Sequence, residues 1–220
     1  VAGELREALR AAASQILECP ASDIEFADGT VGSRRDPSRN IGLGRLAAVA
    51  GDSQRGFEHY GTYTLPPGTF AFAAHATMVE IDGVTGAINI MKYVAIHDCG
   101  NEINPMIVKG QIHGGLVQGL SEALFEEVAY QADGRPKAWS LMDYTLPAAG
   151  DIPDLTVETY PTAARNGPLG VRGIGEMAAV ASPPAVSNAI HDALRPIGVS
   201  HVDLPLTQER VWEAFQRRSA

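Results

Sequence analysis

The sequence predicts an α+β fold in which mixed β-sheets pack against helices. Three observations carry this prediction. An amphipathic helical pattern opens the chain, two long apolar strands with a glycine-containing turn between them lie in its middle, and long helical segments follow. The 220 residues, 45% of them hydrophobic, suffice for one large domain or two small domains with a substantial core.

The first part of the chain predicts a small lobe built from a helix and a hairpin. The expected elements are a helix ended by Pro20, a hairpin, a polar loop and a short helix, over residues 2–18, 24–31, 32–40 and 43–50. A connector rich in Gly and Pro follows over residues 51–68. We therefore expect a helix-hairpin lobe over residues 1–55 and a larger domain over residues 56–220.

The larger domain predicts strands followed by helices. The expected strands are residues 70–81, 87–96, 126–131, 137–145 and 155–160. The expected helices are residues 106–125, residues 176–194 and a final helix opened by Leu206 and Thr207. Pro183 and Pro184 are expected to break or kink the second helix. The first helix contains four glycines, which cost roughly 3–4 kcal/mol relative to alanine, so close helix packing or a bound ligand must offset them.

Composition limits the classes of function. The formal net charge is −9 and the pI is about 5.1, which argues against a nucleic-acid partner. No run of about 18 apolar residues predicts a membrane span, and the first residues lack signal-peptide order, so we expect a cytoplasmic protein. Cys19 and Cys99 are too few for a zinc ribbon or an iron–sulfur site made by this chain alone, and free thiols are expected.

The most informative motif is Gly170-Val-Arg-Gly-Ile-Gly-Glu-Met177. It sets Glu176 directly after a three-glycine turn and at the start of a predicted helix. Glycines let the backbone approach a ligand closely, and a helix N-terminus offers free N–H groups to an anion. The alternative interpretation is an ordinary turn whose acid is favoured by the helix dipole.

Three further polar segments accompany this turn: the loop from Asp98 to Asn104, the helix start from Gln111 to Gly119, and the Ser187-Asn188 pair. The Gln111 amide can donate and accept hydrogen bonds, which suits the edge of a heterocycle. Arg172 can meet a cofactor phosphate or pair with an acid.

The remaining candidates favour structural roles. His75 is expected to be a hydrogen-bonded core histidine, His113 to be structural or peripheral, and Cys99 to be a small buried filler.

The ordered motifs resemble the C-terminal part of the large subunit of molybdenum hydroxylases, the family of xanthine dehydrogenase, aldehyde oxidase and aerobic carbon monoxide dehydrogenase. The resemblance runs from about residue 60 to residue 215 and more faintly before that. The motifs that carry it are Asp98-Cys-Gly-x-x-Ile-Asn-Pro105, Gly110-Gln-x-x-Gly-Gly-x-x-Gln-Gly119, Gly170-x-x-Gly-x-Gly-Glu176 and Pro184-Ala-x-x-Asn-Ala189.

This resemblance implies a molybdopterin-binding domain with Glu176 as the catalytic base. It implies a cofactor contact from Gln111 and backbone contacts from Ile174 and Gly175. The complete set of residues predicted to bind the cofactor is Gln111, Ile174, Gly175, Gly173, Arg172, Asn104 and Asp98. The resemblance also implies that the molybdenum is held by the pterin dithiolene, so that no protein side chain is needed on the metal.

The resemblance further implies oxidation of an aldehyde, an N-heterocycle or carbon monoxide with oxygen derived from water. Electrons would leave through [2Fe-2S] clusters and FAD on other segments or subunits, and the rest of the large subunit would be a further partner. Because the front half of such a subunit is missing here, the chain is not expected to turn over alone. The substrate and the nucleotide form of the pterin, the cytosine dinucleotide being one option, stay open.

Two hypotheses from other classes stay beside this one. The chain can be a non-catalytic scaffold or assembly domain that retains the cofactor-shaped loop. It can also be an unrelated binding domain for an anionic small molecule, with the turn at residues 170–175 acting as an anion nest.

Overall fold

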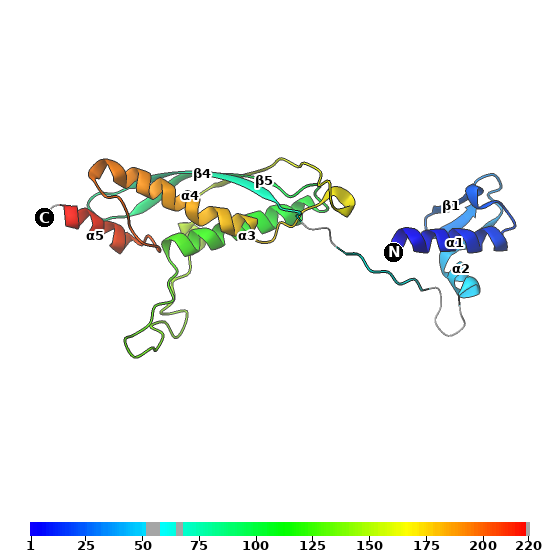
Figure 1. The fold of residues 1–220 in the computed structure, drawn as a ribbon, viewed down its shortest axis with the longest axis horizontal. Helices are drawn as coiled ribbons and strands as arrows, with labels where there is room; N and C mark the ends of the chain where they lie inside the picture. Colours follow the sequence, from blue (N-terminus) through cyan, green and yellow to red (C-terminus); the bar gives the residue numbers. More distant parts are fainter. Residues whose placement is uncertain (52–57, 65–67, 219–220) are drawn as a thin grey trace. The chain divides into compact units, whose positions relative to one another are not determined.

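A computed structural model describes residues 1–51, 58–64 and 68–218 and divides the chain into two compact units, Val1–Leu65 and Pro66–Ala220 (Figure 1). Within the predicted connector, residues 52–57 and 65–67 lie outside the described residues. No helix of the described part is long and apolar enough to cross a membrane.

The first unit consists of a helix and a short helix around a small antiparallel sheet. The elements are α1 (Ala2–Ile16), β1 (Ile24–Ala27), β2 (Thr30–Ser33), β3 (Asn40–Gly42) and α2 (Leu43–Ala50). The strand order is β1-β2-β3. Its core is formed by Leu9, Ala13, Ile24, Val31 and Leu46. The predicted helices and hairpin are thus confirmed, because helical spacing and an Asp-Gly turn are strong local signals.

The second unit contains a three-stranded mixed sheet. Its strands are β4 (Phe72–Ile81), β5 (Ile88–Asp98) and β6 (Leu155–Thr159). β4 and β5 are antiparallel, whereas β5 and β6 are parallel. The predicted fold class of mixed strands with packed helices is therefore confirmed.

Helices α3 (Pro105–Leu124) and α4 (Met177–Leu194) lie side by side in this unit, and α5 (Gln208–Arg218) follows (Figure 1). A Cβ atom at Gly115 would lie 2.8 Å from Ala178 Cβ, and one at Gly119 would lie 2.6 Å from Ser182 Cβ. These two glycines therefore allow the close approach of α3 and α4, which offsets part of their cost to the helix.

The core of the second unit lies between the sheet and this helix pair. Its buried side chains include Tyr93, Ile112, Leu116, Leu120, Val186, Ile190 and Leu206. Short 3₁₀ turns flank the main elements at Ala21–Asp23, Ala149–Asp151, Pro168–Gly170 and Arg195–Ile197.

The predicted strands over residues 126–131 and 137–145 are wrong. Residues 126–148 instead form an extended arm that leaves the end of α3 and returns at the 3₁₀ turn Ala149–Asp151 (Figure 1). A single isolated bridge, Tyr130 with Pro136, closes its tip. A strand needs a neighbouring ladder, and Pro136 has no amide hydrogen to offer one.

The sequence predicted a break or a kink at Pro183 and Pro184, and the break is wrong, because α4 continues through both residues. A proline inside a helix removes a hydrogen bond and costs about 3 kcal/mol. Here Pro183 is buried, and a Cβ at Gly119 would lie 2.8 Å from its Cδ. The tertiary packing of the two helices therefore outweighs the local preference of proline.

Candidate functional site

Glu176 occupies the N-cap position of α4, at the end of the glycine turn. Its side chain is exposed and makes no capping hydrogen bond. Its backbone carbonyl accepts the first intrahelical bond from Val180 N–H at 3.1 Å. The carboxylate is therefore not used to cap the helix, and it stays available to a ligand next to the unpaired N–H groups of the first turn.

Gly173 and Gly175 have open space around their Cα atoms. A Cβ at Gly173 would meet nothing within 4 Å, and one at Gly175 would meet only Gln111 Nε2, at 3.9 Å. Neither residue has a positive φ angle. Neither backbone conformation nor internal packing therefore requires glycine at these positions, and their bare backbone can receive a ligand at close range.

Ile174 lies between these glycines and packs against the core of the second unit. Its side chain therefore anchors the turn while the backbone on both sides stays exposed. Gln111, on the first half of α3, is exposed beside Gly175. The structure thus brings together four predicted site residues, Gly173, Gly175, Glu176 and Gln111.

A groove of about 740 Å³ opens beside this turn. Its lining includes Phe70, just before β4, and Phe72 at the start of β4, together with Met177 and Val180 of α4. Of the described residues that line it, Glu176 alone is ionisable. An apolar groove with a single carboxylate suits an organic ligand.

Asp98 and Arg172 pair with one another instead of facing the groove. Arg172 Nη1 lies 2.7 Å from Asp98 Oδ1, and both side chains are largely buried. The N–H groups of Gly100 and Thr162 also donate to Asp98, at 2.8 and 3.1 Å, and the Thr162 hydroxyl donates to its second oxygen.

The pKa of Asp98 reflects these contacts. Partial burial acts to raise the pKa, but the hydrogen bonds from Thr162 and Gly100 and the charge of Arg172 lower it to about 2. Asp98 is therefore a fixed anion. Arg172 was predicted either to meet a cofactor phosphate or to pair with an acid, and in the structure it pairs with Asp98. Its guanidinium also lies over the ring of Phe72, 5.5 Å from the ring centroid.

Two further contacts join the loop after β5 to the glycine turn. Asn101 N–H donates to Gly170 O at 2.9 Å, and Arg172 N–H donates to Cys99 O at 2.7 Å. The Asn101 side chain donates to Leu169 O at 2.7 Å. We name residues 98–101 and 169–172, with Thr162, the clasp. It fixes the start of the turn that ends in Glu176.

Asn104 is the N-cap of α3, and its Oδ1 accepts a hydrogen bond from Ile107 N–H at 3.2 Å. This contact gives its side chain a structural partner. Sequence reasoning missed Thr162 and Asn101, which hold the clasp together. No local pattern marks them, because their partners lie 64 and 68 residues away along the chain.

A buried polar cluster lies under the sheet. His75 Nδ1 is 2.9 Å from the Tyr93 hydroxyl, and His75 Nε2 is 3.0 Å from His97 Nε2. Burial, with a smaller effect of His97, lowers the pKa of His75 to about 4. His75 is thus hydrogen-bonded, as the sequence predicted, but it is only partly buried and lies outside the core.

Two other sequence interpretations concern Cys99 and His113. Cys99 is buried in the core, and this burial raises the pKa of its thiol. Both cysteines are free. His113 Nε2 is buried without a hydrogen-bond partner in the described part of the chain.

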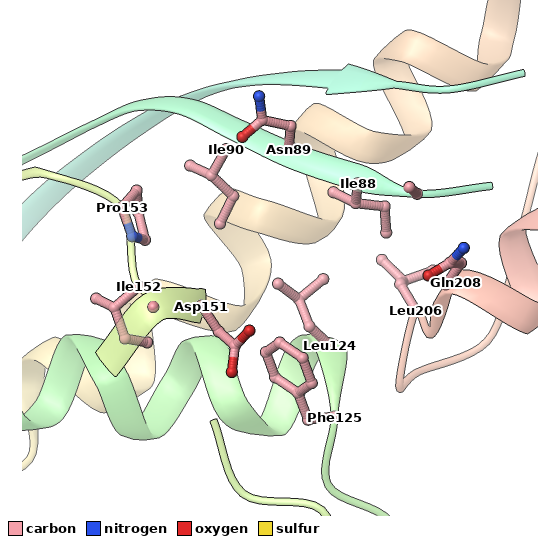
Figure 2. Close-up of a pocket in the computed structure, with 12 residues that line it drawn as sticks. Ile88, Asn89, Ile90, Leu124, Phe125, Asp151, Ile152, Pro153, Leu206 and Gln208 are labelled. Atoms are coloured by element: carbon pink, nitrogen blue, oxygen red, sulfur yellow. The ribbon is translucent and has the colours of Figure 1, made fainter. Parts of the chain in front are cut away.

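A second cavity, of about 360 Å³, lies at the other end of α3 (Figure 2). Ile90, Leu124, Phe125 and Ile152 supply its apolar wall, and Asp151 points into it. The Asp151 carboxylate accepts a hydrogen bond from Ala148 N–H at 2.7 Å. Because neither Glu176 nor Gln111 lines this cavity, it is a weaker candidate for the chemistry.

Within the described residues, no group of three or more His, Cys, Asp or Glu side chains could hold a metal ion. The groups near Glu176 that could bind a ligand are instead the Gln111 amide and the exposed backbone of Gly173 and Gly175. This donor set suits an organic ligand.

Comparison with known proteins supplies the family context. Residues 1–153 match the family described as molybdopterin cofactor-binding domain. The chain is 36% identical to the nicotine 6-hydroxylase large subunit of Paenarthrobacter nicotinovorans and 32% identical to the carbon monoxide dehydrogenase large chain of Hydrogenophaga pseudoflava. Each alignment covers 96% of this chain and 27% of the relative.

The crystal structure of quinoline 2-oxidoreductase from Pseudomonas putida 86 superposes with a TM-score of 0.82 at 35% sequence identity. It covers 99% of this chain, which in turn covers 29% of that chain. The present chain thus spans little more than a quarter of the length of the proteins it matches.

Proposed function

The chain belongs to the molybdopterin cofactor-binding domain family, and from this premise we propose that it forms the C-terminal, cofactor-binding portion of the large subunit of a molybdenum hydroxylase. One observation carries the proposal. The exposed Glu176 side chain, which makes no capping hydrogen bond, lies next to the open backbone of Gly173 and Gly175. Such an arrangement suits a bulky ligand lying against backbone with one carboxylate beside it.

The residues present fit a pterin cofactor. Because Gly173 and Gly175 have no side chains, the space beside their backbone is open, and the Gln111 amide lies at its edge. We name this open backbone surface the cradle, and a Cβ atom at either glycine would project into it. Gln111, Gly173 and Gly175 would hold the cofactor, and Ile174 would anchor the cradle to the core. When bound, the cofactor supplies the redox chemistry and the site at which water-derived oxygen is activated.

Glu176 would act as the general base. Its position beside the cradle lets it take a proton from the activated water. The apolar walls of the groove, including Phe70 and Phe72, would exclude bulk water from the reacting groups. Asp98 and Arg172 act indirectly in this proposal, because the clasp holds the turn that carries Glu176.

We propose an aldehyde, an N-heterocycle or carbon monoxide as the substrate. Two relatives are named for nicotine and carbon monoxide, and the solved relative is named for quinoline. Electrons would pass to iron–sulfur clusters and flavin on other segments or subunits. The molybdopterin cytosine dinucleotide is one form that the cofactor could take.

The test is Glu176→Gln in the whole enzyme that contains this chain. We expect turnover to fall by about 10²–10⁴-fold, the usual contribution of a general base, with molybdenum content unchanged. Glu122→Gln is the matched control, because Glu122 is exposed on α3 outside the groove lining. Turnover within about tenfold of wild type for Glu176→Gln would show that the base assignment is wrong.

A further inference from the structure

The arm of residues 126–148 carries a cluster of exposed apolar side chains. Trp139, Leu141 and Met142 are 70%, 76% and 96% exposed, respectively. Val128 and Tyr130, also on the arm, are 65% and 60% exposed. Large exposed apolar clusters on a protein mark interaction surfaces, and Trp and Met are enriched where proteins meet.

The arm is ordered by its own hydrogen bonds. Lys137 N–H donates to Ala129 O at 2.8 Å, and Gln131 N–H donates to Arg135 O at 2.7 Å. The segment that carries the apolar cluster is held by Asp143, whose carboxylate accepts hydrogen bonds from Trp139 N–H and the Ser140 hydroxyl at 3.3 and 3.2 Å. The Tyr144 hydroxyl donates to Glu126 and joins the two sides of the arm at its base.

The arm does not contribute to the core of its own unit. Among the described residues, neither the core nor the apolar side chains packed around it include any residue of the arm. Figure 1 shows the arm projecting away from α3 and from the sheet. Its apolar cluster therefore has no internal partner in the described part of the chain.

The partner that best accounts for the exposed side chains of the arm is the rest of the large subunit. The chain spans 27% of the length of its curated relatives, and the matched structure contains 99% of this chain, nearly all of the arm included, inside a much longer polypeptide. A second copy of this chain is less favoured, because its formal net charge of −9 opposes association of two identical chains.

We propose that the arm docks this chain onto the rest of the large subunit, with Trp139, Leu141 and Met142 inserted into an apolar pocket there. This inference rests on the proposed function, because it takes the remainder of a molybdenum hydroxylase large subunit as the partner. The preformed bend at Asp143 lowers the entropy cost of docking, since the three side chains are already presented together.

Site-specific photocrosslinking in the purified enzyme tests the proposal. Leu141→p-benzoylphenylalanine is introduced, the assembled enzyme is irradiated, and the crosslinked peptides are identified by mass spectrometry. We expect the crosslink to join Leu141's position to large-subunit residues outside this 220-residue sequence. A crosslink to these 220 residues, a crosslink to another subunit, or no crosslink at all would overturn the docking proposal.

A pair of substitutions provides a second readout. Leu141→Asp should reduce recovery of the assembled enzyme by about tenfold or more, because it buries a charge in an apolar pocket. Arg135→Ala is the matched control at the polar tip of the arm, and it should assemble like wild type. Wild-type assembly of Leu141→Asp would also overturn the proposal.

These measurements are independent of molybdenum content and turnover. A failure of docking therefore leaves the role of Glu176 open to its own test. Conversely, an enzyme without molybdenum can still report where the arm binds.

Discussion

At the scale of single residues, the least expected feature of the turn is how little the fold requires its glycines. Gly173 and Gly175 have ordinary φ angles and open surroundings. By contrast, Gly100 has φ +72°, and a Cβ there would lie 2.2 Å from Gly170 O. The backbone itself requires glycine at position 100, whereas we propose a ligand as the reason for the first pair.

This distinction predicts the behaviour of Gly175→Val. The valine should change the free energy of unfolding by about 0.5 kcal/mol or less, since its Cβ meets only Gln111 Nε2 at 3.9 Å. Pterin and molybdenum content should fall by about tenfold or more, because the new side chain occupies the cradle. Gly150→Val, at another glycine with open surroundings, is the control and should retain the cofactor. Full cofactor occupancy in Gly175→Val would count against the cradle.

His75 predicts a pH dependence of stability. Its folded pKa of about 4 lies below its ordinary value of 6.5, so the unfolded state binds more protons between these values. The stabilisation is complete above pH 6.5 and is lost as the pH falls towards about 4. We expect a loss on the order of 2 kcal/mol after allowance for the partial exposure of the ring.

Thermal unfolding of wild type and His75→Gln across this pH range measures the effect. The variant should lose less stability on acidification than wild type does. His201→Gln serves as the control, because the His201 ring is exposed and should leave the wild-type slope unchanged. Parallel curves for wild type and His75→Gln would contradict the assignment.

At the scale of elements, the clasp connects the sheet to the site. It joins the end of β5 to the glycine turn through an ion pair between residues 74 positions apart. Removing one partner of a largely buried ion pair leaves the other charge uncompensated. The clasp therefore links the stability of the second unit to the position of Glu176.

Asp98→Asn should destabilise the protein by about 3 kcal/mol, because Arg172 loses its anion. Urea unfolding measures this change, and the double variant Asp98→Asn/Arg172→Met should recover part of it through the coupling of the two sites. The wild-type contribution persists above the ordinary Asp pKa of 3.8 and disappears as the pH falls to about 2. An unchanged urea midpoint for Asp98→Asn at neutral pH would rule out this role.

Some elements of the fold could be predicted from the sequence and others could not. Strands β4 and β5 and helices α1, α3 and α4 follow from apolar periodicity and turn residues, which are local signals. The arm resembles strands because its apolar residues alternate as in a half-buried strand, but no strand of the described residues pairs with them. The continuity of α4 through Pro183 depends on Gly119, which lies far away in the sequence.

The candidate site was predictable to a similar extent. The glycine spacing singled out Glu176, and amide chemistry singled out Gln111, which lies beside Gly175 in the structure. The family resemblance gave both residues their expected roles. The pairing of Asp98 with Arg172 and the part played by Thr162 depend on long-range contacts that no short pattern encodes. The residue types were therefore visible in the sequence, but the division between cradle and clasp was not.

At the scale of the whole molecule, the proposed cradle occurs together with an arm whose apolar side chains have no partner among the described residues. It spans about 27% of the length of its curated relatives. The exposed arm, the groove beside Glu176 and the open glycines all face outward from the second unit. These features agree with a domain that completes its site only together with the rest of a larger enzyme.

The most direct test is the molybdenum and pterin content of the enzyme purified from its native host with every chain that co-purifies. Elemental analysis gives the metal, and fluorescence after denaturation gives the pterin. We predict near-stoichiometric amounts of both for wild type and a large loss of both for Gly175→Val. A fully assembled complex that repeatedly contains neither would contradict the proposal and would favour a non-catalytic scaffold.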